Sequence, residues 1–228
     1  MALAASGTAI VFHSAAAFIY AYTIYYSFSL VKAPKSDPNL AYAVKAKYLT
    51  QWNLGLCGLY FGLCLVLDVR PTRSLYRLRD YIFCSILLPS CIFVNVFLWG
   101  LYSVDRETVF STEIEAFHSK WVNRHSHTLV TITAVCEALL YPHEVPAKRR
   151  GFAGIFAWFG FYQLWVLYLG IGERIWVYPV MRILSPSAMT VFFVGCCVVA
   201  FVLQTICNIM LRLRYWVAAP RTEECKRA

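Results

Sequence analysis

The stretch AMTVFFVGCCVVAFVLQTICNIML, residues 188–211, contains no Asp, Glu, Lys, Arg or His. An α-helix needs about 20 apolar residues to cross the hydrocarbon core of a bilayer. An uninterrupted apolar run of this length therefore predicts a transmembrane helix.

Five further apolar stretches precede this one, separated by segments that carry charges or prolines. We place the predicted spans at residues 8–31, 48–67, 81–104, 125–141 and 152–170, with Pro89 as a kink in the third. Residues 68–79 are interpreted as a polar loop with four arginines. The sequence thus predicts an all-α fold, a polytopic bundle of about six membrane-spanning helices. Residues 1–228 form one integral membrane domain that ends in a basic tail, 212–228.

The composition agrees with a membrane protein, since 60% of the residues are hydrophobic and only 14% are charged. Soluble domains carry roughly a quarter charged residues. The net charge is +9, but the basic residues lie at the ends of apolar segments, which indicates lipid headgroups as partners and excludes nucleic acid. Twelve of the 21 Lys and Arg fall on the side that holds both termini of a six-helix chain. The positive-inside rule then predicts that both termini are cytoplasmic. We expect the membrane to be the plasma membrane or that of the endoplasmic reticulum.

The nine cysteines indicate neither disulfides nor a metal site. The chain has no CxxC pair, and no Cys/His spacing is typical of zinc ligands. Eight of them fall within apolar segments and are interpreted as packing residues. The sequence therefore predicts no metal and no cofactor.

Ionisable groups within a membrane span are costly, so they are functional candidates. His125, His127 and Glu137 stand out, all in or beside the fourth span. Asn123, His127 and Thr131 share one helical face, and Glu137 lies close to it. This polar stripe predicts partners elsewhere in the bundle.

The second span offers a matching stripe that contains Thr50, Asn53, Cys57 and Cys64. The second and fourth spans start on the same side of the membrane, so Thr50 and His127 are expected at comparable depth. A histidine can take the proton of a threonine hydroxyl during attack on a carbonyl, and Asn53, Asn123 or backbone N–H groups can stabilise the oxyanion. Alternatively, the threonine bonds its own i−4 carbonyl and the histidine is an interfacial residue.

Tyr48-Leu49-Thr50 and Asn123-x-x-x-His127-Thr128 resemble motifs of the androgen-induced gene 1 family, which also contains the androgen-dependent regulator of tissue factor pathway inhibitor. The supporting matches, in family order, are Leu78-Arg79-Asp80, Asp105-Arg106-Glu107, Glu137, Leu164-Trp165 and Trp176-Val177-Tyr178-Pro179.

The resemblance implies a multipass hydrolase that splits fatty acid esters of hydroxy fatty acids. Thr50 would be its nucleophile and His127 its general base. One departure is that Gly170, Ile171 and Gly172 stand where some relatives carry a histidine pair.

Two other functional classes stay open. A small-solute transporter or channel would line its path with the polar stripes, although no inverted repeat is visible. A regulatory membrane protein would act through partners. Glu137 is interpreted either as a structural carboxyl or as a group that orients a histidine.

Overall fold

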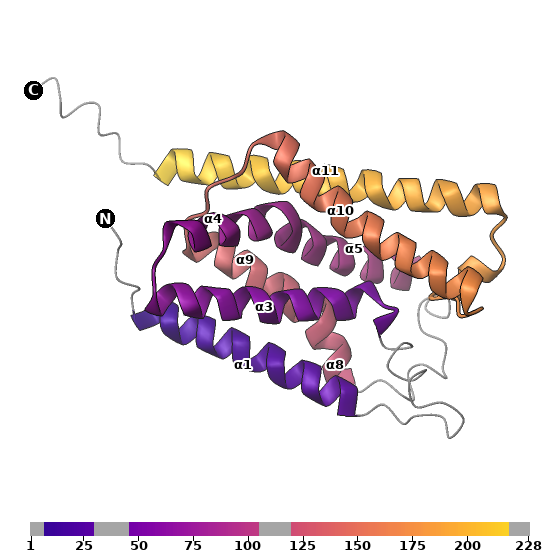
Figure 1. The fold of residues 1–228 in the computed structure, drawn as a ribbon, viewed down its shortest axis with the longest axis horizontal. Helices are drawn as coiled ribbons and strands as arrows, with labels where there is room; N and C mark the ends of the chain where they lie inside the picture. The colour runs from indigo at the N-terminus through magenta and orange to yellow at the C-terminus, as the bar shows by residue number, and fades with distance from the viewer. Residues whose placement is uncertain (1–6, 30–45, 105–119, 219–228) are drawn as a thin grey trace, which may run out of the picture.

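The computed structural model describes residues 7–29, 46–104 and 120–218, and every regular element in these ranges is a helix (Figure 1). The elements are α1 (Gly7–Ser29), α3 (Leu49–Val69), α4 (Arg73–Ile82), η1 (Phe83–Leu87), α5 (Leu88–Val104), α8 (Lys120–Arg124), η2 (His125–Leu129), α9 (Val130–Leu140), α10 (Lys148–Leu167), η3 (Tyr168–Gly172), η4 (Pro179–Arg182) and α11 (Pro186–Ala218). Segments η1, η2 and η3 are π-helical, and η4 is a short 3₁₀ helix.

The predicted class, a polytopic helical bundle, is confirmed. Five helical stretches of the described chain are long and apolar enough to cross a membrane: 7–29, 49–69, 73–100, 148–172 and 186–214. Large apolar side chains point outward from them, among them Phe18, Leu59 and Val191, each more than 70% exposed. In a bilayer such a surface contacts lipid, and helices satisfy their own backbone polar groups there.

The predicted fourth span, 125–141, lies within a continuous helix that α8, η2 and α9 form from Lys120 to Leu140, but this helix is not among those five. It carries Arg124, His125, His127 and Glu137. It packs against α3 and α5.

At two predicted span boundaries the helical structure extends beyond the apolar run. Residues 68–79 do not form a loop: the chain breaks only at residues 70–72, where Pro71 cannot continue a helix, and α4 begins at Arg73. Arginine is a good helix former, so the helix extends beyond the apolar run. For the same reason α11 continues to Ala218, past the predicted end at Leu211.

Pro89 has a different effect from the predicted kink. The π-helical segment η1 ends two residues before it, and the Leu88 N–H bonds the Phe83 carbonyl five residues back. Proline lacks an N–H, so a normal α-helical bond at this position is missing. In the π-helical turn beside the proline, backbone N–H groups bond the carbonyl five residues back instead of four.

The helices are arranged so that α1 begins and α11 ends at one end of the bundle (Figure 1). α1 packs along α3, while α10 and α11 lie together over η1 and α5. α3 and α9 run in the same direction. Residues at the start of α3 therefore share one end of the bundle with η2, and residues at the end of α3 share the other with the end of α9.

Candidate functional site

Thr50 lies in the first turn of α3 and is half-buried. One turn further on, Asn53 is fully buried, and its side chain both donates a hydrogen bond to α5 and accepts one from it. Its Nδ2 donates to the Ser90 carbonyl at 3.0 Å, and Ser90 Oγ donates to its Oδ1 at 2.7 Å. The amide predicted as an oxyanion donor is thus already engaged between two helices.

His127 lies within the π-helical segment η2 and is 7% exposed. Thr131, one turn further on, donates its hydroxyl to the Cys91 carbonyl at 2.9 Å. Asn123, one turn earlier, is half-buried. The buried face of this helix includes Val130, Ala134 and Glu137, so the predicted stripe is the face that packs into the bundle. π-Helical segments frequently occur at functional sites.

His125 lies apart from that face. Its Nδ1 is 2.8 Å from the Trp121 carbonyl, and its ring lies 4.1 Å from the Trp121 ring. His127 is therefore the more deeply buried of the two histidines.

The two stripes meet α5 at the same level. Asn53 of α3 binds Ser90, and Thr131 of α9 binds Cys91, the next residue. Thr50 and His127 each lie one turn earlier on their helices, toward the same end of the bundle. The segments that carry them, α3 and η2, also pack against each other.

Several family-like motifs gather around the start of α3. The Ala46 carbonyl accepts hydrogen bonds from Trp52 Nε1 at 2.7 Å and from Trp165 Nε1 at 3.2 Å, and the Lys47 carbonyl accepts one from Tyr162 at 3.0 Å. The Tyr178 ring lies 6.4 Å from the Tyr48 ring. The motifs around Thr50, Trp165 and Tyr178 thus contribute to one group of aromatic side chains around the start of α3. We call this group the collar; it contains Tyr48, Trp52, Tyr162, Trp165 and Tyr178. Asp105-Arg106-Glu107 lies outside the described residues.

Burial changes the acidity of the groups at this collar. It raises the pKa of Tyr178 to about 12, so the phenol stays neutral at physiological pH. It lowers the pKa of Lys47, with a further contribution from the nearby charge of Arg182.

Gly170 determines how closely Trp176 approaches the helix at this end of the collar. A Cβ on Gly170 would overlap the six-membered ring of Trp176. The glycine therefore permits a close approach of Trp176, which a histidine at this position would prevent.

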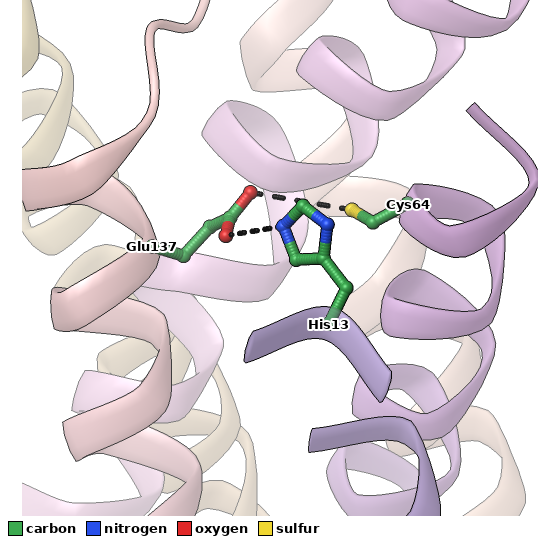
Figure 2. Close-up of side chains that lie close together, drawn as sticks. All are labelled: His13, Cys64 and Glu137. Atoms are coloured by element: carbon green, nitrogen blue, oxygen red, sulfur yellow. Dashed lines mark hydrogen bonds and ion pairs between the residues drawn. The ribbon is translucent and has the colours of Figure 1, made fainter. Parts of the chain in front are cut away.

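A second polar cluster lies at the opposite end of the bundle, around the fully buried carboxylate of Glu137. Tyr60 donates to Oε1 at 2.8 Å, and His13 Nε2 lies 3.2 Å from Oε2. Cys64 Sγ is 4.0 Å from Oε1. Figure 2 shows His13, Cys64 and Glu137 converging from α1, α3 and α9. We call Tyr60, His13, Cys64, Glu137 and His143 the Glu137 cluster.

Two more carboxylates hold the histidines of this cluster. His13 Nδ1 lies 2.7 Å from Asp68, and His143 Nδ1 lies 3.0 Å from Asp80. Arg79 pairs with Asp80 at 2.6 Å. The Leu78-Arg79-Asp80 motif therefore contacts the Glu137 cluster, through Asp80 and His143, and not the start of α3.

The sequence left Glu137 open as a structural carboxyl or as a group that orients a histidine; the histidines it contacts are His13 and His143. It lies about 15 Å further along the helix than His127, at about 1.5 Å per residue. Neither histidine was predicted from the sequence as a partner of Glu137. His13 had a detectable signal, because it is an ionisable residue inside the first apolar span; His143 follows the fourth span and had none.

Comparison with known proteins gives the family. The sequence model of FAR-17a/AIG1-like proteins matches residues 8–212. The chain is 31% identical over 156 residues to the androgen-dependent TFPI-regulating protein of Rattus norvegicus, covering 65% of this chain and 68% of the relative. It is 27% identical over 176 residues to the human androgen-induced gene 1 protein, covering 71% and 74%.

No solved structure matches the chain. The family match covers most of the sequence, and the motifs on which the resemblance rested lie within its range, with Thr50, His127 and Glu137 all inside it. The chain belongs to the FAR-17a/AIG1-like protein family.

Proposed function

We propose that this protein is an intramembrane hydrolase that cleaves fatty acid esters of hydroxy fatty acids, with Thr50 as the nucleophile and His127 as the general base. The substrate is a lipid ester that reaches the site from the surrounding bilayer. The products are a fatty acid and a hydroxy fatty acid.

The observation that carries the proposal is the pair of hydrogen bonds to consecutive residues of α5. Asn53 and Thr131 hold α3 and α9 against Ser90 and Cys91. The predicted nucleophile and base come one turn earlier on these two helices, whose segments α3 and η2 are in contact. This arrangement supports a shared depth for the hydroxyl and the imidazole.

The chemistry follows from the acidity of the two groups. A threonine hydroxyl is a poor nucleophile, so His127 takes its proton as Thr50 Oγ attacks the ester carbonyl. The imidazolium then returns that proton to the oxygen of the departing hydroxy fatty acid, which leaves an acyl-threonine. Water, deprotonated by the same histidine, releases the fatty acid and regenerates the hydroxyl.

The negative oxygen of the tetrahedral intermediate needs donors. Asn53 is bonded to Ser90, and the Gln51 and Trp52 N–H groups are bonded to the Tyr48 carbonyl. Asn123 and the Thr50 N–H at the start of α3 are therefore the candidates. The first N–H groups of a helix have no intrahelical acceptor and lie at the positive end of its dipole. The Tyr48 N-cap makes no side-chain hydrogen bond to them.

The direct test measures ester turnover by purified protein in detergent micelles or liposomes. Thr50→Ala and His127→Ala should each lower kcat by about 10³-fold or more, as is typical when a nucleophile or its base is removed. Thr190→Ala, on the exposed face of α11, and His125→Ala are matched controls that should keep the wild-type rate.

Each variant must retain the wild-type elution volume and thermal unfolding midpoint. Wild-type turnover by folded Thr50→Ala would overturn the assignment of the nucleophile. Loss of turnover in His125→Ala, with His127→Ala active, would assign the base to the other histidine.

A further inference from the structure

The Glu137 cluster brings together the side-chain types that bind transition metals. One ring nitrogen of His13, the Cys64 sulfur and a Glu137 oxygen all lie within 4.8 Å of one another, and all three residues are buried. His143 Nε2 lies 3.5 Å from Glu137 Oε1. Donors about 2.0–2.3 Å from a tetrahedral zinc ion are about 3.3–3.8 Å apart. The separations from Glu137, 3.2, 3.5 and 4.0 Å, are close to that range.

The outer partners of the two histidines match those of metal ligands. His13 Nδ1 faces Asp68 and His143 Nδ1 faces Asp80, so each ring turns its Nε2 toward Glu137. A histidine that binds a metal almost always donates its other ring N–H to a carboxylate, a carbonyl or water. Tyr60 holds the Glu137 carboxylate in the same way.

His143 supplies an independent indication. The residue is 5% exposed, and its Nε2 faces Glu137 Oε1 at 3.5 Å without forming a hydrogen bond within the described part of the chain. When the ring is neutral and donates its one proton from Nδ1 to Asp80, the Nε2 lone pair points at this carboxylate oxygen. Two electron-rich atoms at that distance repel each other, and a cation between them removes the repulsion.

From this geometry we propose that the Glu137 cluster is a binding site for a divalent transition metal ion, zinc above all, with His13, Cys64 and Glu137 as ligands. His143, whose Nε2 lies beside Glu137, would turn toward the ion as the fourth ligand. Sulfur and imidazole donors favour zinc over magnesium or calcium. Binding displaces the Cys64 thiol proton to water. The thiolate and the Glu137 carboxylate then balance the two charges of the ion, which leaves a neutral site inside the bundle.

The site is separate from the proposed hydrolase centre, because it lies at the other end of α3 and α9. Its ligands come from three helices and the segment after α9. Because the ligands are far apart in the sequence, their spacing did not predict a metal. A bound ion would link α1, α3 and α9 to one another.

The test measures the metal content of the full chain, expressed in zinc-supplemented medium and purified in detergent without chelator. We expect about one zinc per chain in the wild type and in Cys84→Ser, a control at an equally buried cysteine. Cys64→Ser should lose most of the bound metal. Protein loaded with Co²⁺ should show a thiolate-to-cobalt absorption band that Cys64→Ser lacks and Cys84→Ser keeps.

Wild-type protein with well under one metal ion per chain and no cobalt band would overturn the proposal and leave a proton-linked hydrogen-bond network. A cobalt band that persists in Cys64→Ser would overturn it as well. The wild-type measurements decide the question even if a variant fails to fold.

Discussion

At the scale of single residues, the two histidines of the fourth predicted span have different surroundings. His127 is buried in η2 on the face that packs into the bundle, whereas the His125 ring lies tilted against Trp121 outside that face. The spacing of four residues from Asn123 already favoured His127, because it places His127 and not His125 on the polar helical face. Burial favours the same residue, because a general base is most effective where water is excluded.

Glu137 gives a residue-scale prediction about stability. Glu137→Leu removes a fully buried carboxylate from Tyr60 and His13, which leaves their polar atoms without a partner. Breaking a buried pair in this way costs about 3–5 kcal/mol. We expect a clearly lower unfolding midpoint, measured by thermal denaturation in detergent.

A second, more conservative substitution at Glu137 separates structure from catalysis. Glu137→Gln keeps the shape and some hydrogen bonds, and its distance from His127 predicts a kcat within about threefold of the wild type. A large loss of kcat in a Glu137→Gln protein of unchanged stability would show that the carboxylate acts in the reaction.

At the scale of elements, α5 is the support to which the two functional helices are bonded. Asn53 and Ser90 exchange two hydrogen bonds across the α3–α5 contact, and Trp158 Nε1 of α10 donates to the Ser90 hydroxyl at 3.2 Å. One serine thereby connects three helices around the level of the proposed site.

This contact predicts energetic coupling between Asn53 and Ser90. Polar contacts between membrane helices contribute about 0.6 kcal/mol on average and up to about 1.7. A double-mutant cycle with Asn53→Ala and Ser90→Ala should give a coupling energy in that range, measured by reversible unfolding in mixed micelles. Additive effects within about 0.3 kcal/mol would contradict it.

Gly170 gives a further element-scale prediction. Gly170→Ala places a methyl group where the Trp176 ring lies, so the segment between η3 and η4 must move. We expect altered Trp fluorescence and a higher KM, because the collar around the start of α3 loosens. The exposed Gly172→Ala should leave both unchanged, since nothing but the Tyr168 ring approaches it.

At the scale of the whole molecule, the architecture could be predicted because it follows from long apolar runs. The helix ends could not, since the arginines of α4 and α11 continue a helix beyond the apolar run. The polar face of η2 and α9 was predictable from the turn of about 100° per residue. The partners of Glu137 were not, because the positions of His13 and His143 depend on how separate helices pack.

The central claim is that Thr50 carries the acyl group during turnover. The most direct measurement is peptide mass spectrometry of the purified chain after reaction with a fluorophosphonate that traps activated hydroxyl nucleophiles. We predict one adduct per chain on Thr50, absent in His127→Ala and present in His125→Ala. An adduct on another residue, or full labelling of folded Thr50→Ala, would contradict the account.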